Sequence, residues 1–229
     1  MRPMLAQMTY LQWKASRWVL LPFVLLCFGL PQLALRVATE GATYRGVVAA
    51  DGLVYGLQLW MPVFPLLAAI VGFAAALTAW VWDHNANHVY ALSLPLRRSQ
   101  YTLLKLAAGG ASLLVPVVAI LIGAVVALLL NEVPEGLRSY PVAFTMRFLL
   151  AALLAYALGF ALAAGTIRTT VLISAAFLLF LIGGTLLVGF IEGVTELDMR
   201  TPIDLLYQAF GTWAGPFHVY GGAWTLIDV

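Results

Sequence analysis

Charged residues are scarce in this sequence of 229 residues: they make up 10% of it, whereas 63% of the residues are hydrophobic and the mean hydropathy is +0.97. Soluble domains usually carry about 25% charged residues, so this composition excludes a water-soluble protein and indicates an integral membrane protein. Segments that alternate polar and apolar residues, as in membrane β-barrels, are also missing, because the apolar runs are continuous and rich in Leu and Ala. Continuous runs of this kind cross a bilayer only as helices.

Motifs for catalysis or ion transport are missing too. No GxxxxGK[ST] sequence occurs that could hold a nucleotide phosphate. The apolar runs also lack paired acids, a serine with a base, or a metal cluster. Six ionisable residues border the runs at their ends, where their side chains can reach the lipid headgroups: Arg36, Asp83, Lys105, Arg147, Arg168 and Glu192. We therefore expect neither an enzyme nor an ion pump or proton-coupled transporter.

Residues that could form a disulfide or bind a metal are few. Cys27 is the single cysteine and lies in the first apolar run, so no disulfide within the chain is possible. His84 and His88 have the spacing of a two-histidine metal site on a helix, but no third ligand follows nearby. We interpret both as polar residues at the membrane interface and expect no metal or cofactor in this chain.

Five apolar runs approach or exceed the roughly 20 residues that a helix needs to cross a bilayer. The sequence therefore predicts an all-α fold, a polytopic helical bundle that forms a single transmembrane domain over residues 1–229. Its predicted spans are 18–38, 57–82, 104–130, 147–167 and 169–191. Proline residues inside these spans predict kinks at Pro22, Pro31, Pro62, Pro65 and Pro116.

Small residues recur at every fourth position in two of the spans. One stripe is Ala68, Gly72 and Ala76, and the other is Ala151, Ala155, Gly159 and Ala163. Such stripes allow helices to approach closely. The partner helix can belong to this chain or to a second copy.

The segments at the two ends of the chain differ from the spans. Residues 1–17 place apolar side chains on one helical face, so we expect an interfacial helix on the membrane surface rather than a cleaved signal peptide. Residues 193–229 are rich in Gly and Pro and contain Trp213 and Trp224, aromatics that favour the membrane interface. We expect an extracytoplasmic re-entrant element there, and a weak sixth span over residues 205–227 is the alternative.

The distribution of basic residues sets the expected orientation. With the N-terminus in the cytoplasm, seven Lys and Arg residues lie inside and five outside, which agrees with the positive-inside rule. The acidic residues are more lopsided, since only Asp83 lies inside. The polar segment between the second and third spans therefore faces the cytoplasm.

That segment reads WDHNANHVYALSLPLRRSQYTLLK and covers residues 82–105. Asp83 can cap a short helix over residues 84–94, and Pro95 can end it. Arg97 and Arg98 can then anchor the chain at the anionic inner leaflet. The segment thus predicts a short amphipathic helix exposed to the cytoplasm.

The same segment resembles the cytoplasmic loop of ABC-2 type transporter permeases. Members of that family carry an acid, a spacer, Leu-x-x-Pro, Arg, Tyr and Lys between their second and third spans. Many members have a glycine after the acid, where this chain has His84. The matching residues here are Asp83, Leu92, Leu94, Pro95, Arg97 or Arg98, Tyr101 and Lys105.

This resemblance implies the permease subunit of an ABC transporter, an exporter in the cytoplasmic (inner) membrane of a prokaryote. Two permease copies, or this chain and a related permease, would work with two separate ATPase subunits that hold ATP and Mg²⁺; no nucleic acid partner is implied. Residues 84–94 would form a coupling helix that docks on an ATPase. The residues implied in this contact are Asp83, His84, Asn87, His88, Tyr90, Ala91, Leu94, Pro95, Arg97 and Arg98.

Family members usually have six spans, with re-entrant helices outside between the fifth and the sixth. The resemblance therefore implies that the native chain continues beyond Val229 into a sixth span. The transported substrate does not follow from the sequence. The alternative function is a non-transporting membrane scaffold or assembly subunit.

Overall fold

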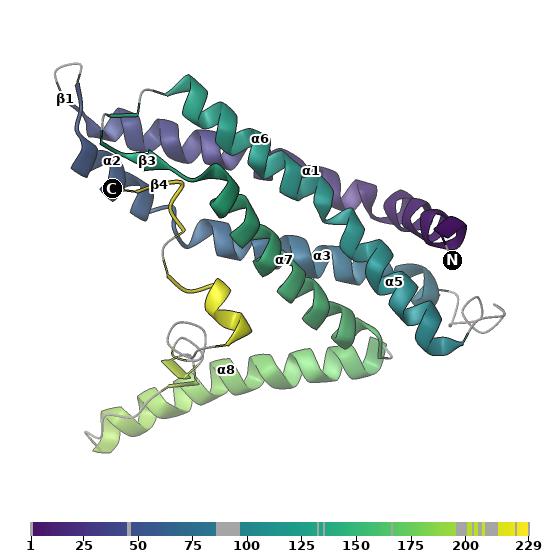
Figure 1. Cartoon of the computed structure of the whole chain (residues 1–229). Coiled ribbons are helices and arrows are strands. Elements are labelled where there is room, and N and C mark those ends of the chain that lie inside the picture. Colours follow the sequence, from purple (N-terminus) through teal and green to yellow (C-terminus); the bar gives the residue numbers. More distant parts are fainter. Residues whose placement is uncertain are drawn as a thin grey trace. The chain divides into compact units, whose positions relative to one another are not determined.

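The architecture of the chain comes from a computed structural model, shown in Figure 1. The chain divides into two compact units: unit 1 is Met1–Phe160 with Ala223–Val229, and unit 2 is Ala161–Gly222. The structure describes residues 2–44, 47–85, 97–131, 133–134, 136–165, 167–195, 201–202, 204–205, 208, 215–222 and 224–228.

Unit 1 consists of helices joined at one end by short strands (Figure 1). We call this end the strand end and the opposite one the N-terminal end. The helix α7 leaves unit 1 at Phe160, and the last strand, β4, returns to it. The elements are α1 (Arg2–Ala42), β1 (Thr43–Tyr44), β2 (Val47–Val48), α2 (Ala50–Gln58), α3 (Val63–Asn85), α5 (Arg98–Ser112), α6 (Leu114–Leu130), β3 (Arg138–Ser139), α7 (Pro141–Ala163) and β4 (Ile227–Asp228).

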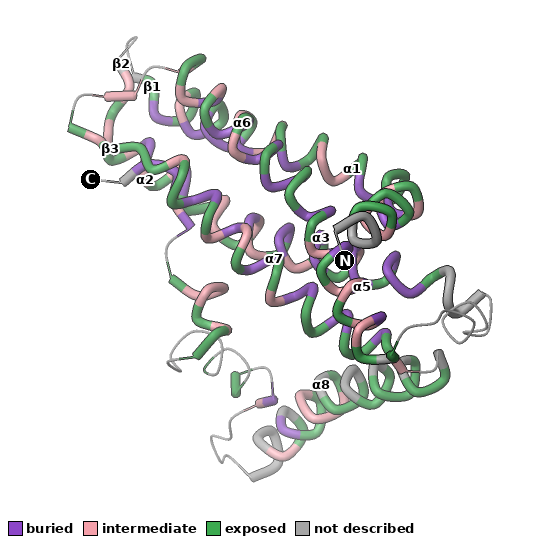
Figure 2. The backbone as a smooth tube through the Cα atoms, turned by 45° about the vertical axis from the view of Figure 1, so that its right-hand side comes forward, coloured by how far each residue is buried: buried purple, intermediate pink, exposed green. Residues whose placement is uncertain are grey.

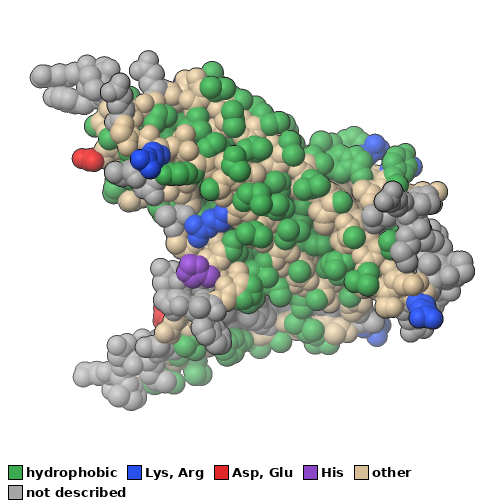
Figure 3. Space-filling model, viewed as in Figure 1, with side chains coloured by type: hydrophobic (Ala, Val, Ile, Leu, Met, Phe, Trp, Pro, Cys, Tyr) green, Lys and Arg blue, Asp and Glu red, His purple; other side chains and the backbone are tan. Residues whose placement is uncertain are grey.

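Four helical stretches are long and apolar enough to cross a membrane: Ala6–Ala42, Ala50–Val81, Ser99–Leu130 and Pro141–Ala163. Hydrophobic side chains also cover much of the face shown in Figure 3. The prediction of a helical membrane protein is therefore confirmed. These four stretches contain the predicted spans 18–38 and 104–130, all but the last residue of 57–82 and most of 147–167, and each begins earlier than predicted. The fifth predicted span, 169–191, is not among the four and lies within α8 (Ile167–Thr195).

The first helix corrects the prediction for the N-terminus. Residues 1–17 were expected to lie on the membrane surface as a separate helix, but α1 runs without a break from Arg2 to Ala42. No helix-breaking residue separates residues 1–17 from the predicted span 18–38, and the helix also continues through Pro22 and Pro31. A buried stripe follows one side of α1 at helical spacing: Gln12, Ser16, Leu20, Cys27, Pro31, Leu35, Ala38 and Ala42.

This stripe makes α1 the central helix of unit 1. It packs along α2, α3, α5 and α6, so the purple buried positions of α1 in Figure 2 face other helices. The contact with α6 is close because Gly123 has no side chain: a Cβ there would overlap the backbone carbonyl of Phe28. Residues 1–17 are therefore held in part by contacts within the protein, because Gln12 and Ser16 are buried.

Two of the predicted kinks interrupt the spans. A proline ring clashes with the carbonyl four residues before it. Accordingly, α2 ends at Gln58, four residues before Pro62, and α5 ends at Ser112, four residues before Pro116. In the connecting turns, hydrogen bonds join residues three apart instead of four, such as the one from the amide of Leu113 to the carbonyl of Gly110 at 3.2 Å.

The two stripes of small residues pack against each other. A Cβ on Gly72 of α3 would lie 2.8 Å from Ala155 Cβ of α7, and a Cβ on Gly159 would lie 2.9 Å from Ala76 Cβ of α3. Aromatic residues flank this contact, with Phe64 and Phe144 edge to face at 4.8 Å between ring centroids. The partner left open by the sequence is thus a helix of the same chain.

The end of the chain pairs with the loop before α7. Strand β4 lies antiparallel to β3, and the amide of Tyr140 donates to the carbonyl of Leu226 at 2.9 Å. The indole of Trp224 is 2% exposed, edge to face with Phe144 and 5.2 Å from the guanidinium of Arg147. The sequence placed Trp224 at the membrane interface, but this ring is buried in protein because β4 brings it against α7.

Unit 2 contains the long helix α8 (Ile167–Thr195) and the 3-10 helix η1 (Pro216–Val219). Thr201 and Asp204 cap the start of a further helical stretch, since the amide of Thr201 donates to Asp204 Oδ2 and the amide of Asp204 donates to Thr201 Oγ1. Pro202 lies against Gly184 of α8. A continuous sixth helix over residues 205–227, the alternative from the sequence, is wrong because η1 and β4 interrupt it.

Candidate functional site

The predicted coupling segment joins the ends of α3 and α5 at the N-terminal end of unit 1 (Figure 1). Asp83 and His84 lie in the last turn of α3. The sequence expected Asp83 to cap a new helix at residue 84, but α3 continues to Asn85, because no glycine or proline stops it there. The remaining predicted residues of the loop lie outside the described part of the chain: Asn87, His88, Tyr90, Ala91, Leu94 and Pro95.

The other side of the loop begins helix α5. Arg97 is exposed and stands at the N-cap position without a side-chain capping bond, and Arg98 is the first helical residue. Basic residues at a helix N-terminus oppose the helix dipole, at a cost of a few tenths of a kcal/mol. The stability of α5 therefore does not explain the presence of these two arginines.

A buried cluster lies between α3 and α5, near the helix ends that flank this loop. Lys105 of α5 is 6% exposed, and its Nζ lies 4.3 Å from the ring centroid of Trp80 of α3. The same Nζ donates to the hydroxyl of Tyr101 at 3.4 Å. Trp80 also contacts Phe160 of α7, with 5.1 Å between ring centroids. We call Trp80, Tyr101, Lys105 and Phe160 the cation–aromatic cluster.

The cluster corrects the sequence interpretation of Lys105. This residue was expected to extend toward the headgroups from the end of a span, but the structure buries it between two aromatic rings. A desolvated ammonium over an aromatic face gains about 2 kcal/mol or more. The spacing of Tyr101 and Lys105 by four residues was visible in the sequence, but the contact with Trp80 depends on how α3 packs on α5.

Helix α7 is tied to α5 next to the cluster. The hydroxyl of Tyr156 donates to the backbone carbonyl of Leu106 at 3.0 Å. Its ring lies against Gly109, where a Cβ would overlap the hydroxyl. Gly109 is therefore a packing position for Tyr156.

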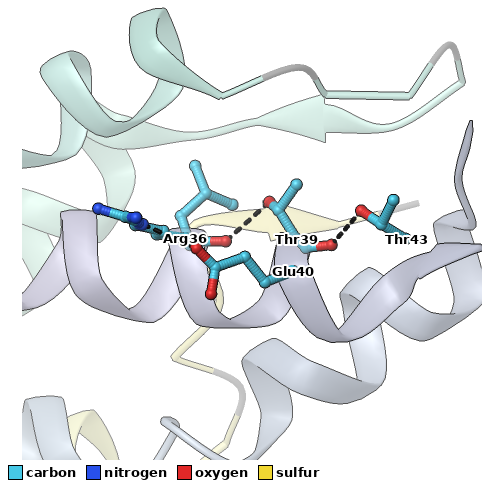
Figure 4. Close-up of polar contacts among 5 residues, drawn as sticks. Arg36, Thr39, Glu40 and Thr43 are labelled. Carbon is cyan, nitrogen blue, oxygen red and sulfur yellow. Dashed lines mark hydrogen bonds and ion pairs between the residues drawn. The ribbon is translucent and has the colours of Figure 1, made fainter. Parts of the chain in front are cut away.

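A second polar site, which the sequence did not indicate, lies at the strand end. Here α1 and α6 border an open pocket of about 520 Å³, lined by Gln32, Leu33, Arg36, Thr39, Glu40, Leu130 and Asn131. Figure 4 shows Arg36 and Glu40 on the last turns of α1, with the guanidinium Nε donating to Glu40 Oε1 at 2.8 Å. Arg36 alone appeared in the sequence analysis, as a residue at the end of a span.

Among the described residues, no group of three or more His, Cys, Asp and Glu side chains lies close enough to hold a metal ion. The side chains of His84 and His88 lie outside that part, so the structure leaves their metal-binding geometry open.

The two sites belong to a polytopic helical membrane protein with polar groups at both ends of its bundle. Comparisons with models of protein families, with curated proteins and with solved structures found no match for this chain.

Proposed function

We propose that this chain is the permease subunit of an ABC transporter, similar to ABC-2 type permeases. The observation that supports this function best is that α3 ends at Asn85 and α5 begins at Arg98 at one end of a bundle with four membrane-length helices, so the predicted coupling segment connects two of these helices. The acid before this segment and the arginines after it fit the loop of that family. The chain itself would carry no nucleotide, and two partner ATPase subunits would bind ATP and Mg²⁺.

The cation–aromatic cluster offers a physical route for coupling. A partner that moves residues 86–96 would pull on Asn85 and Arg98, the ends of α3 and α5. Contacts of Lys105 with Trp80 would make the two helices move together, and the contact of Trp80 with Phe160 would pass the movement to α7. Alternating exposure of a substrate pathway would follow from these helix movements.

The proposed topology places the N-terminus in the cytoplasm and α8 as a fifth span. Residues 193–229 would then form an extracytoplasmic re-entrant element at the outer surface. The pairing of β4 with β3 supports this arrangement, because it holds the last residues at the same end as the loop between α6 and α7. Two permease copies, or this chain and a related permease, would complete the transporter as an exporter in a prokaryotic inner membrane.

The coupling function is tested by the double variant Tyr90→Asp with Leu94→Asp. We expect loss of ATPase association and of transport-coupled ATP hydrolysis, with unchanged membrane insertion, because two new charges would disrupt an apolar docking face. The matched control is Tyr140→Asp at the strand end, an exposed tyrosine outside the loop. Unchanged ATPase co-purification in the double variant would favour the scaffold function instead.

The topology is tested by cysteine labelling with an impermeant thiol reagent. Ser139 in β3 and Ser99 in α5 are both exposed and lie at opposite ends of unit 1. After replacement of Cys27 by Ala, we expect a cysteine at position 139 to react from outside the cell and one at position 99 to react only after permeabilisation. The reverse pattern would invert the orientation and place residues 86–96 away from any cytoplasmic ATPase.

A further inference from the structure

The strand-end pocket differs from the surrounding helix surface because five of its seven lining residues are polar. The two apolar lining residues, Leu33 and Leu130, are 48% and 73% exposed. Charged side chains such as Arg36 and Glu40 are strongly disfavoured in the hydrocarbon, so this part of α1 lies at headgroup depth. The pocket therefore opens where lipid headgroups are found.

The neutral polar groups of the pocket present acceptor oxygens, because some of their donors bond within their own helices. Gln32 Nε2 donates to the carbonyl of Phe28 at 3.2 Å, and Asn131 Nδ2 donates to the carbonyl of Ala127 at 2.8 Å. The hydroxyl of Thr39 donates to the carbonyl of Leu35 at 2.7 Å, as Figure 4 shows. One N–H of each amide and the hydroxyl hydrogen of Thr39 thus bond carbonyls of their own helices. The acceptor oxygens of both amides and of the hydroxyl face no donor in these bonds, and each amide keeps a second N–H.

The two charged groups complement this arrangement. Arg36 and Glu40 form a single hydrogen bond through Nε, which leaves the terminal nitrogens of Arg36 and one carboxylate oxygen of Glu40 for other partners. Their side chains are 74% and 65% exposed, so solvent screens the pair and a ligand can compete with it. The pocket thus offers one cation beside one anion, with neutral acceptors around them.

We propose that this pocket binds a zwitterionic headgroup in which a short linker joins a phosphate to a primary ammonium, as in phosphatidylethanolamine. The phosphate accepts hydrogen bonds from the terminal nitrogens of Arg36, since a guanidinium suits phosphate oxygens. The ammonium donates to Glu40 and to the amide oxygens of Gln32 and Asn131. A choline headgroup has no N–H to donate, and a glycerol headgroup has no cation for Glu40, so both should bind more weakly. This site is independent of the proposed ATPase coupling.

The test measures lipid binding to the purified full-length chain by native mass spectrometry. The probes are phosphatidylethanolamine, phosphatidylcholine and phosphatidylglycerol with identical acyl chains. We expect about tenfold preference for the ethanolamine lipid over the choline lipid, about the size of one charge-assisted hydrogen bond. Glu40→Gln should remove this preference, and Arg36→Gln should weaken binding of the ethanolamine lipid about tenfold by loss of the phosphate contact.

The matched control is Arg17→Gln, another exposed arginine of α1, about 28 Å along the helix from Arg36. It should leave the ethanolamine preference unchanged. Soluble glycerophosphoethanolamine, which has the same headgroup without acyl chains, distinguishes a free zwitterion from a lipid as the ligand. If it displaces bound phosphatidylethanolamine as well as the lipid itself does, the ligand is a soluble molecule. If it does not displace the lipid, the acyl chains contribute to binding along Leu33 and Leu130. Equal affinity of the unmodified chain for the three lipids, or an ethanolamine preference that survives in Glu40→Gln, would overturn the proposal.

Discussion

Replacing Gly72 by Ala should separate α3 from α7. The added Cβ would lie 2.8 Å from Ala155 Cβ and 2.9 Å from the amide nitrogen of Tyr156, and it would overlap the carbonyl oxygen of Ala152. Carbon atoms in contact are normally about 3.5–4.0 Å apart, so the added methyl group is about 1 Å too close. Two of the three clashing atoms belong to the α7 backbone and cannot rotate away, so the helices must move apart.

The expected loss is about 2–3 kcal/mol, near the upper part of the range for overpacking a core. For a chain of this size that corresponds to a fall in Tm of roughly 4–12 °C. The measurement is thermal unfolding of the purified protein in detergent, followed by the helical circular dichroism signal.

The matched control is Gly29→Ala in α1, where an added Cβ would meet no atom within 4 Å. Alanine favours helices over glycine by about 1 kcal/mol, so this variant should be as stable as the parent chain or more so. Equal stability of the two variants would contradict the α3–α7 contact described above.

Three other changes test particular contacts. Trp224→Ala should lower stability by about 3–5 kcal/mol and expose the end of the chain to protease, because it removes a large buried ring; limited proteolysis would detect this, and an unchanged cleavage pattern would contradict the docking of β4. Tyr156→Phe should cost about 1 kcal/mol by loss of the hydrogen bond to Leu106, as seen in Tm, whereas an unchanged Tm would mean that the bond contributes nothing. In a double-mutant cycle with Lys105→Met and Trp80→Leu, we expect a coupling energy of about 2 kcal/mol; additive effects of the two substitutions would refute the cation–π contact.

The sequence alone determined the class of the protein. Its low charge and long apolar runs required helices across a bilayer, because backbone groups in hydrocarbon must bond within their own segment. The positions of Pro62 and Pro116 also predicted where two spans are interrupted, since a proline acts on the carbonyl four residues before it. These properties depend only on residues close together along the chain.

Contacts between distant residues needed the tertiary structure. The stripes of small residues that include Gly72 and Gly159 were visible in the sequence. A small residue permits close packing of a neighbouring helix but does not identify that helix. In the same way, the spacing of Tyr101 and Lys105 could not show that Trp80 completes a buried site around the ammonium. Burial changes the energy of such a charge far more than position along the chain does.

The strand-end pocket shows most clearly the difference between what the local sequence determines and what tertiary packing determines. The sequence identified Arg36 only as a charge at the end of a span and did not single out Glu40. Their value as a binding site depends on Asn131, which lies far away in the chain and reaches the pocket through the packing of α6 on α1. Local sequence therefore decided that these helices form and are long and apolar enough to cross a membrane. Tertiary packing alone decided which polar groups share a site, since only packing brings distant side chains within hydrogen-bonding reach.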